Sequence, residues 1–233
     1  MTMTKLQYLL RGGKELSCGE LCARALDSVA RSLLEDGPQR LKVTLTSADP
    51  PRLSVVPLSR ERLALISLWD ERDPVGAAAR WTPRLAALAG RLRLEGYHVE
   101  EALPRAYARD WPDGAQTPGV GLLTLLRRRP GLSDMEFFRR WHDGHSPLAL
   151  RVHPLWCYVR NVIARPVVDG TPPLCGIVEE QFRTPADLLD PVRLFGGPLR
   201  MIPNMARIGL DVRGFLDLGT LENYLVSEHW LRS

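Results

Sequence analysis

The feature that most constrains the fold of this chain is an order of predicted strands and helices that occurs twice. The 233 residues divide near Thr117, and each half predicts a strand, a helix, two strands, a helix and a final strand. The halves share this order rather than residue identities. Each half therefore has the βαββαβ pattern of a ferredoxin-like unit, in which a four-stranded antiparallel sheet carries two helices on one face.

The first half, residues 1–116, shows this pattern in the spacing of its apolar residues. Strands are expected over residues 5–10, 41–46, 63–69 and 97–105, which are alternating or continuous apolar runs. Helices are expected over residues 16–34 and 81–92, where apolar residues recur at helical spacing. Gly37 and Pro38 follow the first of these helices and predict its end.

The second half, residues 117–233, has stronger local signals. Strands are expected over residues 120–127, 156–163, 175–182 and 221–228. Ser133, followed by Glu136, forms a capping-box pattern for a helix that ends near residue 143. Thr184 can cap a helix over residues 184–194, with Pro185 in its first turn. Residues 195–219 are expected to form a long irregular stretch.

Both faces of each predicted sheet carry apolar residues, so the face without helices must also be covered. The two sheets of one chain can cover each other. We therefore expect an α+β fold in which two ferredoxin-like repeats, residues 1–116 and 117–233, pack sheet to sheet as a pseudo-dimeric barrel. Its helices would lie outside, and a cavity between the sheets would suit a small ligand. Two independent domains on a string are the alternative.

Composition argues against several classes of function. The 31 Lys and Arg against 27 Asp and Glu give a net charge of only +4, and the basic residues are too dispersed to predict a nucleic-acid surface. No apolar run approaches the ~18 residues that a membrane span needs, and the N-terminus lacks a signal-peptide pattern. The four scattered cysteines indicate free thiols. We expect a cytoplasmic protein that binds neither nucleic acid nor membranes.

A resemblance to a known family is visible in the second half. The residues that carry it are Arg129-Pro130-Gly131-Leu132-Ser133, Phe138, Trp141, His145-Ser146-Pro147-Leu148, Pro154, Tyr158, Asn161, Asp169-Gly170, Gly176-Ile177-Val178-Glu179 and Glu228. Together they resemble the EthD family of dimeric α/β-barrel proteins, whose members pair two identical domains through their sheets. The first half lacks this polar signature and looks like a degenerate copy. The resemblance therefore implies that the second half supplies the functional wall of the cavity and the first half a supporting wall.

His145 is the first candidate catalytic residue. It follows Gly144, a common helix terminator, and precedes Ser146-Pro147, which favours an extended backbone. A helix edge of that kind can point an imidazole into a cavity, where histidine exchanges a proton near neutral pH. The alternative is that His145 caps helix carbonyls or holds the following loop.

Glu179 is the second candidate. In a strand over residues 175–182, Glu179 and Glu180 point to opposite faces, so one of them must point inward. The resemblance selects Glu179 as the cavity residue, where partial burial would raise its pKa and suit it to proton transfer. A structural carboxylate paired with Arg127 or Arg160 is the alternative.

Five further residues are candidates for substrate binding: Tyr158, Asn161, Trp141, His142 and Glu228. Tyr158 and Asn161 lie three apart, so in a regular strand only one of them faces the cavity. His142 and His145 could approach a metal, but two histidines do not make a site and no third ligand is identifiable. We therefore predict no metal, and a solvent-facing His142 is favoured over metal binding or catalysis.

The resemblance implies a cofactor-independent enzyme of the lyase or isomerase type. It would dehydrate, decarboxylate or isomerise a small apolar, oxygenated or aromatic molecule, with His145 moving the proton, Glu179 assisting and Tyr158 donating to a substrate oxygen. A non-catalytic binding or accessory protein and a heme-binding barrel are the alternatives. The fused pair is expected to be a monomeric pseudo-dimer or a homodimer.

Overall fold

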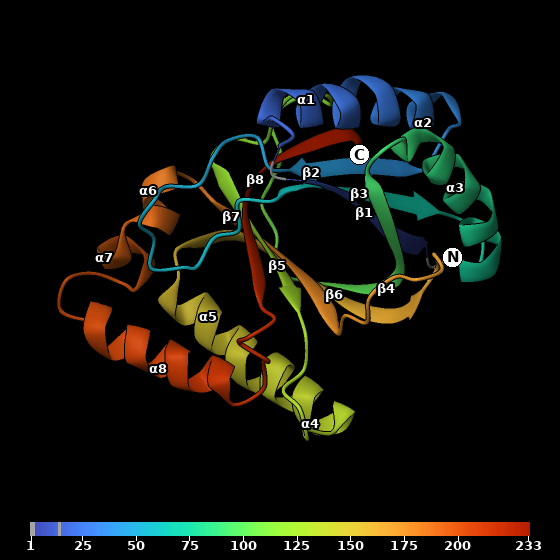
Figure 1. The fold of residues 1–233 in the computed structure, drawn as a ribbon. Helices are drawn as coiled ribbons and strands as arrows, with labels where there is room; N and C mark the ends of the chain where they lie inside the picture. Colours follow the sequence, from blue (N-terminus) through green and yellow to red (C-terminus); the bar gives the residue numbers. More distant parts are fainter. Residues whose placement is uncertain (1–2, 14) are drawn as a thin grey trace.

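The structure, a computed structural model, describes residues 3–13 and 15–233. These residues form one closed antiparallel barrel in the strand order β1-β3-β2-β8-β5-β7-β6-β4, with the helices outside it (Figure 1). The strands are β1 (Thr4–Gly12), β2 (Arg40–Leu45), β3 (Arg62–Asp70), β4 (Arg93–Arg105), β5 (Val120–Leu126), β6 (Leu155–Pro166), β7 (Gly176–Phe182) and β8 (Glu222–Arg232). The pairs β2–β8 and β4–β6 join the two halves. The expected sheet-to-sheet barrel of two ferredoxin-like units is confirmed.

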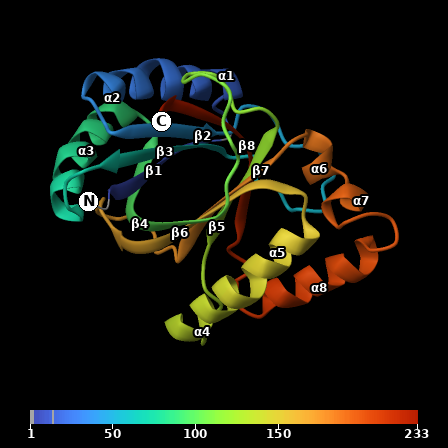
Figure 2. The ribbon, with the colours of Figure 1, turned by 180° about the vertical axis from the view of Figure 1, so that it is seen from behind.

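The helices of the two halves lie on opposite sides of the barrel, as both ribbon views show (Figures 1 and 2). The first half has α1 (Cys18–Cys22), the π-helical η1 (Ala23–Ala30), α2 (Arg31–Glu35) and α3 (Pro74–Ala89). The second half has α4 (Asp134–Arg139), the π-helical η2 (Arg140–His145), α5 (Ser146–Val152), α6 (Pro185–Leu189), α7 (Pro191–Leu194) and α8 (Met201–Arg213). Within the described ranges, no helix has the length and apolar character to cross a bilayer.

Both predicted helix starts of the second half are confirmed. Ser133 Oγ accepts a hydrogen bond from the backbone N–H of Glu136 (3.2 Å), which satisfies a donor that the first turn leaves free. Thr184 Oγ1 accepts one from the N–H of Asp187 (3.3 Å), and the Asp187 carboxylate binds back to Thr184. The helix after Thr184 is divided in two, however, because Pro191 starts a new turn after Asp190.

The predicted helix end near Gly144 is wrong. Helices α4, η2 and α5 run on without a break to Val152, because η2 passes through Gly144 in a wider π turn. The backbone N–H of Ser146 bonds to the carbonyl of Trp141, five residues earlier. Pro147 then lies in the first turn of α5, where its missing N–H is tolerated. His145 is therefore inside a helix rather than at its edge.

The predicted irregular stretch over residues 195–219 is also wrong, because it contains α8. Two glycines before the helix and Pro203 and Gly209 inside it hide the helical pattern. Pro203 is tolerated because it lies in the first turn. Gly209 costs only about 1 kcal/mol relative to alanine in a helix.

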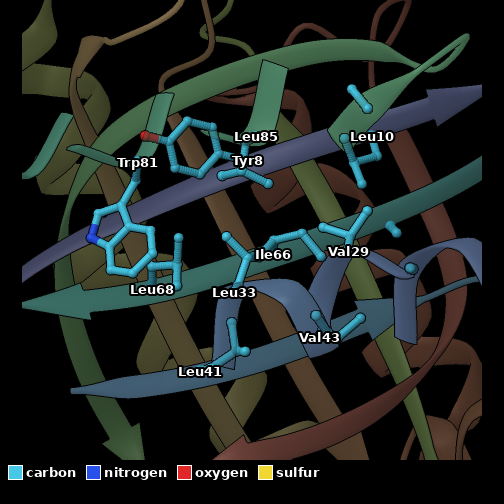
Figure 3. Close-up of a cluster of buried hydrophobic side chains, with 14 of the residues drawn as sticks. Tyr8, Leu10, Val29, Leu33, Leu41, Val43, Ile66, Leu68, Trp81 and Leu85 are labelled. Atoms are coloured by element: carbon cyan, nitrogen blue, oxygen red, sulfur yellow. The ribbon is translucent and has the colours of Figure 1, made fainter. Parts of the chain in front are cut away.

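In the first half, buried apolar side chains pack between the sheet and its helices. Val29 and Leu33 of the first helix and Trp81 and Leu85 of α3 pack onto Ile66 and its neighbours on the sheet, and all have no exposed surface (Figure 3). Full burial of each such side chain stabilises the fold by about 1.5–3 kcal/mol. This side of the barrel is a packed scaffold.

The barrel interior is also largely filled. One layer is apolar and contains Leu9, Leu65, Leu123 and Ile177. The adjacent layer is polar, and its members come from both halves: Lys5, Gln7, Lys42, Asn161, Glu179 and Glu228. The expected cavity between the sheets is therefore restricted to one end of the barrel, where β2, β6 and β8 contribute to its wall.

Candidate functional site

A cavity of about 320 Å³ lies between the outer face of the second sheet and the helices that cover it. Its floor is formed by β5, β7 and β8, and its roof by η2 and α8. Most of its lining is apolar and includes Leu122, Trp141, Val178, Phe182, Ile208 and Val212. A partly open apolar cavity of this size with a few polar groups is typical of a small-molecule site.

The cavity exists because α8 stands away from the sheet. In the first half, α3 packs directly on its sheet and buries Ala77, Trp81, Leu85 and Ala89. Helix α8 has no fully buried residue, and it lies beside α5 at a distance from the strands (Figures 1 and 2). The two halves thus share a topology but differ in how closely the last helix packs.

Glu180 is the polar group that the sequence analysis missed. It lies on the outer face of β7 between Leu122 of β5 and Tyr158 of β6, and its side chain lines the cavity. No donor among the described residues bonds to its carboxyl group. Burial raises its pKa from 4.5 to about 7. Both protonation states are therefore accessible at neutral pH, as a group that accepts and returns protons requires.

His145 lines the same cavity and is held by a carboxylate from α8. Its Nδ1 lies 2.7 Å from Oδ2 of Asp211, so Nδ1–H donates to the carboxylate. In the neutral ring, Nε2 is then the acceptor, and the hydrogen bond fixes the tautomer and the ring orientation. His145 thus lines a cavity, but this cavity lies outside the barrel and not between the sheets, where the sequence analysis expected it.

Tyr158 is the third polar group of this cavity. Its hydroxyl lies 3.2 Å from Oγ of Ser146, and burial raises its pKa to about 12. The phenol therefore stays protonated. Because the Ser146 hydroxyl donates to the carbonyl of Trp141 (2.9 Å), the Tyr158 hydroxyl donates to Ser146 Oγ and must leave that bond to donate to a ligand. His153 also lines the cavity, but its Nδ1–H donates to the carbonyl of Leu194 (2.9 Å), and burial lowers its pKa to about 4. A neutral, bonded imidazole of this kind is structural.

Glu179 points into the barrel, as expected, but its predicted chemistry is wrong. Burial alone would raise its pKa, but the positive charges of Lys42 (2.7 Å) and Lys5 (3.8 Å) outweigh that effect and hold the pKa at about 2. Glu179 is thus ionised at neutral pH, and its partners are lysines rather than Arg127 or Arg160. It lies on the opposite face of β7 from the cavity that His145 lines, so it cannot act with His145.

The other predicted residues are divided between the two faces of the sheet. Asn161 donates to Glu179 (3.2 Å) inside the barrel, and Glu228 lies there too. Tyr158 and Asn161 therefore face opposite ways, as their spacing predicts. Trp141 lines the outer cavity, whereas His142 is half-buried against Trp141 outside the lining. Among the residues described, no cluster of three metal-ligating side chains occurs.

No protein-family model and no curated protein matches this chain. Solved structures do match it. An anthrone oxidase-like protein aligns over 99% of this chain and 92% of its own, with 13% identity and a TM-score of 0.61. A candidate monooxygenase from Fusobacterium nucleatum aligns over 99% and 93%, with 9% identity and a TM-score of 0.53. With the closed barrel and the repeated element order, these likenesses identify the fold as a dimeric α/β barrel made by the two halves of a single chain.

Proposed function

We propose that the chain is an enzyme that transfers a proton on a small apolar, aromatic or oxygenated molecule, bound in the cavity that Glu180 lines. One observation carries the proposal: a carboxyl group without a protein donor, with a pKa near 7, faces an apolar cavity. A carboxyl so placed is typical of a catalytic acid or base. The resemblance of the second half to the EthD family supports the same class of function.

The three polar groups of the cavity suit three roles. The Glu180 carboxylate accepts a proton from an activated C–H or O–H of the substrate. The Tyr158 hydroxyl donates a hydrogen bond to the substrate oxygen on which negative charge develops. His145, oriented by Asp211, exchanges a proton at a second substrate atom. These steps need only side chains of this chain.

Two outcomes can follow proton removal. The first is non-oxidative: return of the proton at another atom gives an isomer, and departure of hydroxide, which is protonated to water, gives a dehydrated product. A decarboxylation runs in the other direction, since loss of CO2 leaves a carbanion that takes up a proton from the acid form of the base. In the second outcome the carbanion reacts with dioxygen and takes up a proton to give a hydroperoxide, which loses water and leaves a ketone on the ring. This oxidase-type outcome is a second candidate, and the description of one matched structure as anthrone oxidase-like and the other as a candidate monooxygenase favours it.

Anthrone is a suitable probe, because its methylene protons are acidic and its rings are apolar. Under anaerobic conditions in D2O, the protein should accelerate exchange of these protons, measured by mass spectrometry. Glu180→Gln should lower that acceleration by about 10²–10⁴-fold, the range for loss of a general base. Glu100→Gln, an exposed site on β4, is the matched control and should leave the rate unchanged.

The wild-type rate should rise with pH through about 7, because the Glu180 carboxylate is the active form. Retention of the wild-type rate by Glu180→Gln would overturn the proposed role. In air, an oxygen electrode separates the two outcomes, because only the oxidase consumes dioxygen. Saturable binding of anthrone without exchange would instead identify a non-catalytic binding protein.

A further inference from the structure

We propose that the open end of the barrel is a second ligand site, which takes a planar aromatic carboxylate. A cavity of about 440 Å³ opens there, lined by Lys42, Cys157, Val159, Glu228 and Trp230 from three strands. These side chains point into the barrel, whereas Glu180 lies on the outer face of the same sheet. The site is therefore independent of the proposed proton-transfer cavity.

The outer wall of this barrel-mouth cavity comes from the segment that joins the two halves. Tyr107, Arg109 and Trp111 of that segment line the cavity. The rings of Tyr107 and Trp111 are held in place, since Trp111 packs on Tyr107 (5.2 Å between centroids) and on Trp156 (5.5 Å). The indole of Trp230 also donates to the Tyr107 hydroxyl (2.9 Å). The wall is thus an ordered aromatic surface.

The carboxylates of the mouth are already engaged by protein groups. Glu101 accepts from Nζ of Lys5 (2.6 Å) and from the indole of Trp69 (3.3 Å). Glu228 pairs with Nζ of Lys42 (3.2 Å). Because their charges are compensated within the barrel, these groups offer little to a cationic ligand.

The donors of the mouth, by contrast, are incompletely used. The guanidinium of Arg40 lies 4.8 Å from the ring centroid of Trp230 and forms no ion pair with a described carboxylate. Nη1 of Arg109 and Nε1 of Trp111 are enclosed and have no acceptor among the described residues. An enclosed donor without an acceptor costs free energy. These two nitrogens have almost no accessible surface, and Arg109 already pairs with Asp113 through Nη2, so Arg40 is the cation on which a ligand carboxylate can bind.

Two requirements therefore define the ligand. The tryptophan and tyrosine rings favour a planar aromatic body, and Arg40 favours a carboxylate, which guanidinium binds in a charge-assisted geometry. A volume of about 440 Å³ accommodates two fused rings. A naphthalene carboxylate combines these features.

Isothermal titration calorimetry with 2-naphthoate tests the site, and 2-naphthamide is the neutral analogue. Wild-type protein should bind 2-naphthoate saturably, and 2-naphthamide at least tenfold more weakly. Arg40→Gln should lower the affinity for 2-naphthoate at least tenfold, because it removes a cation at the mouth. Arg91→Gln, at an exposed arginine between α3 and β4, is the matched control and should not change it.

Two buried valines distinguish the two cavities. Val159→Phe fills the barrel mouth, whereas Val178→Phe fills the cavity of Glu180. Binding of 2-naphthoate should be lost in the first variant and kept in the second; if Val159→Phe does not fold, Arg40→Gln carries the test alone. The proposal is overturned if 2-naphthoate gives no saturable heat, if 2-naphthamide binds equally well, if Arg40→Gln binds as wild type does, or if Val178→Phe abolishes binding.

Discussion

Glu179 and Glu180 are adjacent in the sequence, yet the sheet gives them opposite electrostatic environments. Glu179 faces two lysines inside the barrel, and its pKa falls to about 2. Glu180 faces an apolar cavity outside it, and its pKa rises to about 7 because its charged form loses hydration without gaining a partner. The sequence predicts that the two side chains diverge, but it does not tell which face holds compensating charges.

The raised pKa of Glu180 predicts a pH-dependent stability. The folded pKa of about 7 exceeds the unfolded value of 4.5, so the folded state binds the proton more tightly. This contribution is fully present below pH 4.5 and is lost as the pH rises through about 7. Between pH 4.5 and 8, the free energy of unfolding measured in urea should fall by roughly 2 kcal/mol more for wild type than for Glu180→Gln. This is somewhat less than the full pKa shift of Glu180 corresponds to, because water enters the cavity.

Glu100→Gln is again the control, and its stability should follow that of wild type across this range. Parallel pH profiles for wild type and Glu180→Gln would show that the Glu180 carboxyl has the same pKa in the folded and unfolded chain. The proposed base would then lack the raised pKa that its role requires.

At the scale of elements, the strands were the most predictable part of the fold. Fully buried strands such as β3 are continuous apolar runs, and each predicted strand lies within a few residues of an observed one. The helices were less predictable where glycine and proline interrupt them, as in η2 and α8. The candidate site was predicted only in part, because the outer cavity depends on how far α8 stands from the sheet, and Asp211 lies on that helix.

The packing of α8 predicts its local stability. Helix α3 has four buried residues and α8 has none, so α8 should open at a lower free energy. Hydrogen–deuterium exchange followed by mass spectrometry should show faster exchange in peptides from residues 201–213 than in those from residues 74–89. A ligand in the Glu180 cavity should slow the exchange of α8 and leave α3 unchanged. Equal protection of the two helices without ligand would contradict this expectation.

At the scale of the molecule, the two halves supply opposite charges to the polar layer inside the barrel. Lys5 and Lys42 come from the first half, and Glu179 and Glu228 from the second. The second half contains no lysine. Two copies of the second half could not reproduce this arrangement, because their buried glutamates would face each other without these cations.

Separate chains of residues 1–116 and 117–233 should therefore pair with each other rather than with themselves. We expect each fragment alone to lack cooperative unfolding, and an equimolar mixture to regain it together with the size of one barrel. Circular dichroism and size-exclusion chromatography measure the two properties. A fragment 117–233 that unfolds cooperatively alone, or forms a stable homodimer, would show that the cross-half ion pairs do not direct assembly.

The covalent link between the halves also determines how many equivalent copies of a cavity one barrel contains. A barrel of two identical chains contains every cavity twice, and any substitution changes both copies at once. In the present chain β4 leads into β5 within one polypeptide, so a substitution changes one half and leaves the other intact. One wall can then remain close-packed while the other opens around Glu180, and each barrel holds a single copy of that cavity.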